Sequence, residues 1–149
     1  MKIAIGGDHA GFELKNELIP LIQELGHEVI DCGTNSTAPV DYPDFSRAVG
    51  ELVRDKKVDR GIVVCGSGAG ATIAANKIRG VRAALAHDVY TAHQGVEHDD
   101  VNVLTMGSRV IGPAIAREVV ESFLKADFSG EERHRRRLEK VLEIELKNT

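Results

Sequence analysis

Short apolar runs alternate with longer stretches of helical periodicity along the chain. Five runs rich in Val, Ile, Leu and Ala predict β-strands, because each is bounded by Gly, Asp or a charged turn. These runs are Lys2–Gly6, Glu28–Asp31, Gly61–Cys65, Arg82–Ala86 and Asn102–Met106. Strands that alternate with helices are typical of βαβ units, so the pattern predicts a parallel sheet covered by helices.

The stretches between these runs predict helices. Apolar residues recur at helical spacing at Leu14, Leu18, Leu21, Ile22 and Leu25. Pro20 inside this pattern predicts a kink. After a loop through 41–43 we expect a second helix, and further helices should begin near Gly70 and Pro113. The charged segment 131–147 carries a stripe of Leu and Val, which predicts an amphipathic C-terminal helix that packs along this stripe.

The order of the strands predicts where a ligand binds. A doubly wound sheet usually starts at a central strand, with the second and third strands on either side of it. Ligands bind where the winding reverses, beyond the carboxyl ends of the first and third strands. These strands lead into Gly6-Gly7-Asp8-His9 and Cys65-Gly66-Ser67-Gly68, so we expect polar groups to converge there.

Composition and charge narrow the class of protein. A chain of 149 residues fits one domain, 1–149, and with only 4% aromatic residues its core must be built from aliphatic side chains. The net charge of -4 argues against nonspecific nucleic-acid binding. We see no signal peptide or membrane-spanning run, so we expect a cytoplasmic protein without a membrane partner. Cys32 and Cys65 are expected to be reduced thiols, since they end strands that are two spacings apart.

The segment Val63–Thr72 is the most informative part of the chain, because a strand runs through a glycine loop into a helix start. Glycines let backbone amides approach an anion closely, and a helix N-terminus adds a favourable dipole. The loop therefore predicts a site for a phosphate or an enediolate oxygen. The alternative is a tight turn with no ligand. The spacing G-x-G-x-G after the third strand does not match a dinucleotide fingerprint.

Cys65 stands at the start of this loop. The positive end of a helix favours the thiolate of a nearby cysteine, so Cys65 is a candidate base. A cysteine that closes an apolar strand is, however, more often a small buried hydrophobic residue. The glycine loop that follows favours the functional interpretation.

Motifs spread over nearly the whole chain resemble those of the type B ribose-5-phosphate isomerases and the related galactose-6-phosphate isomerase subunits. The motifs are Gly7-Asp8-His9-Ala10-Gly11, Val40-Asp41-Tyr42-Pro43-Asp44, Cys65-Gly66-Ser67-Gly68, Ile73-Ala74-Ala75-Asn76-Lys77, Gly80-Val81-Arg82-Ala83-Ala84, Asn102-Val103-Leu104 and Arg133-His134 with Arg137. Their number and order make the resemblance specific.

The resemblance implies a Rossmann-like three-layer α/β sandwich and an aldose–ketose isomerase of the pentose phosphate pathway. Such an enzyme acts on a sugar phosphate without metal, nucleotide or other cofactor, as a homodimer or homotetramer whose subunits share their sites. Cys65 would remove the proton beside the carbonyl and form a cis-enediolate, and His98 would help to open the sugar ring. Backbone amides around Gly66–Gly70 would stabilise the negative oxygen, with help from the Ser67 hydroxyl.

The resemblance also implies which residues hold the substrate. Asp8 and Tyr42 would contact sugar hydroxyls, while His9, Arg133 and Arg137 would grip the phosphate, since guanidinium groups bind phosphate in bidentate fashion. The complete expected set of substrate-binding residues is Asp8, His9, Tyr42, Gly66, Ser67, Gly68, Ala69, Gly70, Asp99, Arg109, Arg133 and Arg137. Taken without the resemblance, the basic run 133–137 is more typical of a solvated helix face.

One residue departs from the family pattern. Where members usually have His-Asn-Asp-Ala-Asn, this chain has His98-Asp99-Asp100-Val101-Asn102. An ionised carboxylate at Asp99 can accept hydrogen bonds from sugar hydroxyls but cannot donate them. Ribose 5-phosphate is the expected substrate, and the change leaves open a tetrose, allose or galactose phosphate.

His98 presents a geometric puzzle. It ends the helix that descends from the fourth strand, so we expect it at the amino ends of the strands, opposite Cys65, and we hypothesise that a second subunit supplies it. His87, His93, His98, Asp99 and Asp100 together could alternatively suggest a metal site, but their spacing matches no common zinc signature. A non-catalytic phosphosugar or nucleotide sensor and a flavin or dinucleotide protein remain the competing interpretations.

Overall fold

Five parallel strands form one sheet with helices on both faces. The computed structural model describes residues 1–148, and its strand order is β2-β1-β3-β5-β4. The strands are β1 (Lys2–Gly7), β2 (Glu28–Asp31), β3 (Arg60–Cys65), β4 (Ala83–Leu85) and β5 (Val103–Gly107). All five predicted strands are confirmed, with ends that differ by no more than one residue.

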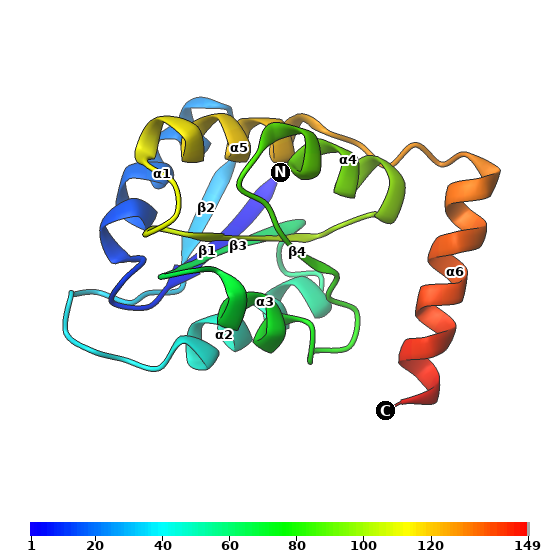
Figure 1. Ribbon diagram of the computed structural model, residues 1–149, viewed down its shortest axis with the longest axis horizontal. Coiled ribbons are helices and arrows are strands. Elements are labelled where there is room, and N and C mark those ends of the chain that lie inside the picture. Colours follow the sequence, from blue (N-terminus) through cyan, green and yellow to red (C-terminus); the bar gives the residue numbers. More distant parts are fainter. Residues whose placement is uncertain (149) are drawn as a thin grey trace.

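Six helices surround this sheet. They are α1 (Phe12–Glu24), α2 (Tyr42–Arg54), α3 (Ala69–Ala75), α4 (Val89–Asp99), α5 (Pro113–Lys125) and α6 (Glu132–Lys147). Helices α1, α4 and α5 cover one face of the sheet, and α2 and α3 cover the other (Figure 1). This is the predicted three-layer α/β sandwich. No helix within residues 1–148 is long and apolar enough to cross a membrane.

The central strands are apolar on both sides because helices cover both faces of the sheet. Residues 3–7 of β1 and residues 61–65 of β3 are all buried, whereas Ile30 of the edge strand β2 is exposed. As predicted, β1 is an interior strand, and the chain winds to β2 on one side of it and to β3 on the other. Gly7 pairs with Val64, so the carboxyl ends of these two strands lie next to each other.

Two local details differ from the sequence interpretation or extend it. Tyr42 and Pro43 belong to the first turn of α2 and not to a loop, since proline is well tolerated where the amide has no helical partner. Pro20 lies inside α1 and does not end it. Cys32 and Cys65 are both free, as predicted.

The prediction that α6 packs along its apolar stripe is wrong for most of the helix. Val141, Ile144 and Leu146 are each at least half exposed, and His134 is the one buried residue of α6. Near its end, Glu145 accepts a hydrogen bond from the Gly80 amide at 2.9 Å. The helix stands beside the three layers because the segment after α5 carries it past the edge of the sheet (Figure 1).

Candidate active site

A pocket of about 350 Å³ lies at the carboxyl ends of β1 and β3, where the winding reverses. Its walls are formed by Asp8, Tyr42, Cys65, Gly66, Ser67, Gly70, Arg109 and Val110. All of these except Val110 belong to the set expected from the sequence. Val110 is an exposed apolar residue in a turn, and no pattern in the sequence singled it out.

Cys65 ends β3 at the wall of this pocket. Its side chain is buried, yet its sulfur accepts a hydrogen bond from the Gly68 amide at 3.2 Å. This hydrogen bond ties the sulfur to the glycine loop. Cys65 is therefore a small buried residue, as is common for a cysteine that closes an apolar strand, and it also borders the pocket.

The glycine loop 66–70 is shaped by close backbone contacts. Gly68 has φ of +84°, and a Cβ there would lie 2.9 Å from the carbonyl carbon of Met106, so only glycine fits. Within residues 1–148, the Gly66 and Ser67 amides donate to no other group of the chain, which leaves two donors for an anion. Helix α3 has only seven residues, so these amides matter more than the helix dipole that the sequence suggested.

Asp8 reaches the pocket from the end of β1, and Tyr42 reaches it from the first turn of α2. Oδ1 of Asp8 accepts hydrogen bonds from the Ala10 and Gly11 amides at 3.0 and 3.1 Å, so this carboxylate also shapes its own loop. The Tyr42 ring packs against Gly70 so closely that a Cβ on Gly70 would lie 2.5 Å from it. The glycine is thus required for the ring to stand over the loop.

Arg109 enters the pocket from the turn that follows β5. A Cβ on Gly66 would lie 3.4 Å from Nη1 of Arg109, which places the guanidinium beside the glycine loop. The backbone of the turn is tied to the same loop, since the Ser108 amide donates to the Cys65 carbonyl at 2.9 Å and the Arg109 amide to the Gly66 carbonyl at 3.0 Å. The Ser108 hydroxyl donates to the Ala10 carbonyl at 2.7 Å.

Three further residues of the expected set lie next to the pocket without forming its walls. Gly68 and Ala69 belong to the glycine loop, between wall residues Ser67 and Gly70. His9 follows Asp8, and its Nδ1 accepts a hydrogen bond from the Val40 amide at 3.2 Å. This bond connects the loop after β1 to the segment that leads into α2.

The remaining expected residues gather elsewhere, where α4 meets α6. The His98 ring stacks on His134 with centroids 4.0 Å apart and planes 25° apart. Arg133 lies next to His134 in α6 and forms an ion pair with Glu131. Burial and the charges of His98 and Arg133 lower the pKa of His134. Arg137 follows one turn later on the same helix.

This second group lies far from Cys65 within one chain. Cys65 pairs with Gly107 at the carboxyl end of β5, whereas His98 lies in the last turn of α4, shortly before β5 begins at Val103. A strand of five residues spans roughly 15 Å. One copy therefore does not bring His98, Asp99, Arg133 or Arg137 to Cys65.

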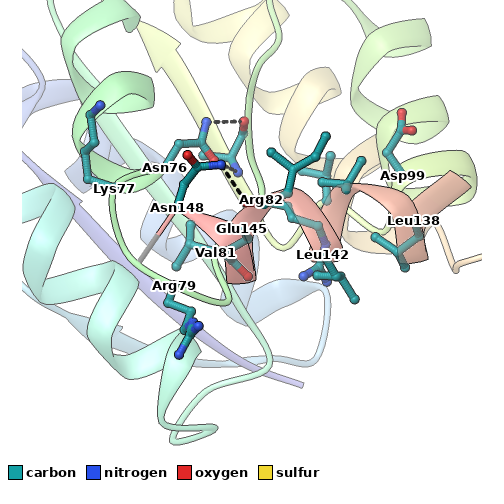
Figure 2. A pocket seen from close by; sticks show the side chains of 14 residues that line it. Asn76, Lys77, Arg79, Val81, Arg82, Asp99, Leu138, Leu142, Glu145 and Asn148 are labelled. Atoms are coloured by element: carbon teal, nitrogen blue, oxygen red, sulfur yellow. Dashed lines mark hydrogen bonds between the residues drawn. The ribbon is translucent and has the colours of Figure 1, made fainter.

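A larger pocket of about 570 Å³ lies between α6 and the segment 76–83 (Figure 2). Asp99 lines it together with apolar residues of α6, among them Leu138 and Leu142. This pocket contains neither Cys65 nor the glycine loop. The larger hollow is thus a groove beside a poorly packed helix, and the smaller pocket, which contains Cys65 and the glycine loop, is the candidate active site.

Most of the residues considered for a metal site are engaged in separate contacts. No group of three or more His, Cys, Asp or Glu side chains within residues 1–148 is arranged to hold a metal ion. His93 pairs with Glu97, and Asp100 pairs with Arg82. Burial and the nearby Asp31 raise the pKa of the Cys32 thiol, which makes Cys32 a poor second candidate for the base.

Residues 3–141 match the model of a family described as ribose/galactose isomerase. The chain belongs to the ribose/galactose isomerase family. A solved structure of ribose-5-phosphate isomerase B from Clostridium thermocellum superposes with a TM-score of 0.97, at 48% identity, over 100% of both chains. Ribose-5-phosphate isomerase B of Escherichia coli is 44% identical over 97% of this chain and 96% of its own length.

The family also contains relatives named for another sugar. D-erythrulose-4-phosphate isomerase of Pectobacterium atrosepticum is 39% identical over 87% of this chain and 86% of its own length. Aldose–ketose isomerisation of sugar phosphates is the chemistry that these relatives share. The resemblance seen in the sequence motifs is thereby confirmed, and so is the predicted class of enzyme.

Proposed function

We propose that this isomerase interconverts ribose 5-phosphate and ribulose 5-phosphate, with Cys65 as the base. The observation that carries the proposal is the position of its sulfur, at the wall of the pocket and under the Gly68 amide. Relatives named ribose-5-phosphate isomerase B share 44 to 48% of their residues with this chain over nearly its whole length. A pentose phosphate pathway role and a cytoplasmic location belong to the same proposal.

The reaction moves one proton between neighbouring carbons. The Cys65 thiolate takes the proton from the carbon beside the aldehyde, and the electrons of that C–H bond form the C=C bond of a cis-enediolate. The free amides of Gly66 and Ser67 donate to the oxygen that becomes negative. The thiol then returns the proton to the former carbonyl carbon, while a proton passes from the neighbouring hydroxyl to the former carbonyl oxygen, which yields the ketose and restores the thiolate.

A second copy of the chain completes the site in this proposal. The expected residues form two groups, one around Cys65 and one around His98, at opposite ends of the strands. Apolar side chains are exposed on α3, β4 and α4, among them Ile73, Leu85 and Tyr90. Apolar surface of this kind marks contact sites. A homodimer or homotetramer would cover it and bring His98 of one copy to Cys65 of another.

The phosphate would then lie among nitrogen-bearing side chains from both copies. His9 and Arg109 are near Cys65, whereas Arg133 and Arg137 come from α6. Bidentate guanidinium contacts are strong ligands for a phosphate dianion. The chain as a whole carries a net charge of -4. The local positive charge of the arginines would therefore stand out on an acidic surface and steer the phosphorylated substrate to the site.

The proposal is tested by proton exchange in heavy water with a panel of aldose and ketose phosphates. Wild-type protein should incorporate solvent deuterium into the product, and Cys65→Ala should lower kcat/KM by roughly a hundredfold or more. Cys32→Ala is the matched control and should behave as wild type. A Cys65→Ala protein with normal exchange would refute the assigned base.

The same panel separates the candidate substrates. Asp99 stands where family members usually have Asn, and a relative is named for a tetrose phosphate. If a four- or six-carbon sugar phosphate were the best substrate, the proposed proton transfer would stand, but the assignment of ribose 5-phosphate would be wrong. Binding of sugar phosphates without exchange would instead favour a non-catalytic phosphosugar-binding protein.

A further inference from the structure

A hydrogen bond from outside the pocket holds the turn that carries Arg109. The Gly107 amide donates to Nε2 of His87 at 2.8 Å. His87 lies between β4 and α4 and forms no part of the pocket wall. The proposed mechanism gives it no role, although its partner ends β5 beside the glycine loop.

Gly107 has little freedom to move. A Cβ there would lie 2.5 Å from the carbonyl carbon of Ser67 and 2.7 Å from the Gly66 oxygen, so its backbone is pressed against the glycine loop. His87 holds the amide of the same residue. The position of Gly107 is therefore set by the loop on one side and by an imidazole on the other.

A shift of Gly107 would reach several parts of the pocket. The next two residues, Ser108 and Arg109, donate their amides to the Cys65 and Gly66 carbonyls. Arg109 also projects its guanidinium beside Gly66. Because these bonds follow directly from the position of Gly107, loosening it would misplace both the cation and the loop that holds the sulfur.

The donor also determines the state of the imidazole. A backbone N–H can only donate, so Nε2 of His87 must be unprotonated, and the ring is neutral with its proton on Nδ1. We infer that His87 is a positioning residue of the isomerase, which fixes Arg109 and the Cys65 loop through the Gly107 amide. The inference rests on the proposed function, because it concerns substrate binding at the same pocket.

Steady-state kinetics test this role with a matched pair of variants. His87→Ala removes the acceptor, and we expect KM to rise about fivefold to tenfold with a smaller fall in kcat, as for one lost hydrogen bond. His87→Gln places an amide oxygen near the position of Nε2 and should restore KM to within about twofold. His27→Ala, at the opposite ends of the strands, controls for loss of an imidazole and should match wild type.

Nuclear magnetic resonance of the wild-type protein tests the hydrogen bond without a variant. Two-bond ¹H–¹⁵N correlations of the His87 ring should show protonated Nδ1 and unprotonated Nε2 at pH 8, and the Gly107 amide should exchange slowly. Protonated Nε2, or a His87→Ala protein with wild-type KM and kcat, would overturn the inference. If His87→Ala does not fold, the KM of His87→Gln and the tautomer of the wild-type ring still test whether His87 holds the Gly107 amide. If wild type isomerises no sugar phosphate, the proposed function fails, whereas the tautomer still reports on the contact.

Discussion

At the scale of single residues, the chain places a lysine where a hydrophobic residue would be expected. Lys15 of α1 is 1% exposed, and its ammonium donates to both carboxylate oxygens of Asp31 at 2.9 Å. Asp31 is itself partly solvated and also accepts from the Gly33 amide. The pair connects α1 to the end of β2.

The unequal burial of this pair predicts unequal effects on stability. Asp31→Ala leaves a buried ammonium without its carboxylate and should lower the free energy of unfolding by about 2–4 kcal/mol. Lys15→Met leaves only the half-exposed carboxylate of Asp31 without a partner, so the free energy of unfolding should fall by only about 1 kcal/mol. Urea unfolding of the two variants measures the difference. Equal losses would contradict the assignment of the cost to the buried charge.

Gly70 offers a second prediction at this scale. Gly70→Ala would place a methyl group in the space of the Tyr42 ring, which can swing outward because it is partly exposed. We expect kcat/KM to fall about tenfold through the misplaced ring, with little change in melting temperature. Gly112→Ala is the control, since nothing lies within 4 Å of a Cβ there. If kcat/KM fell equally in both variants, the replacement of a glycine would be the cause, and the displaced Tyr42 ring would not.

At the scale of elements, α6 is the part of the chain that does not fit a self-contained fold. Its stripe of Val141, Ile144 and Leu146 is largely exposed, while the sheet and the other five helices enclose the two hydrophobic clusters without it. An amphipathic helix gains most of its stability from packing its apolar face. The stripe is thus suited to a surface that one copy does not provide.

Polar substitutions on the stripe test this suggestion. Val141→Ser combined with Ile144→Ser should weaken self-association about tenfold or more, since each change removes apolar surface from the expected contact. Sedimentation equilibrium measures the association constant. Glu139→Ser combined with Glu143→Ser alters exposed residues of the same helix and should leave it unchanged. Equal association in both double variants would place the contact elsewhere.

At the scale of the whole molecule, the two groups of expected residues are separated by the length of the sheet. The glycine loop holds Cys65 at one end, and the junction of α4 with α6 holds His98 and His134 at the other. A site shared between copies would explain this separation. In a symmetric oligomer the same contact is repeated, so the His98 group of each copy would complete the Cys65 site of a neighbour.

Subunit mixing tests the shared site directly. Cys65→Ala and His98→Ala proteins should each be impaired, and unfolding and refolding them together should restore about a quarter of the wild-type activity, since half of the dimers are hybrids with one intact site. The activity of the mixture against each variant alone is the measurement. A mixture no more active than its components would mean that each copy uses its own residues.

Local sequence patterns were sufficient for the elements of this protein, and the order of the strands for the place of its candidate site. Strand and helix periodicity depend on near neighbours, so all five strands were placed within one residue. The winding rule then brought Asp8 and Cys65 to one edge, because parallel strands share the direction of their carboxyl ends.

Only the tertiary structure decided how distant segments meet. No periodicity foretold that α6 would leave the three layers, that His134 would stack on His98, or that His87 would hold Gly107. Each of these contacts depends on how separate elements pack, and a residue's neighbours along the chain do not encode that arrangement. The sequence thus determined which chemistry stands at the end of β3, and the packing decided which residues can reach it.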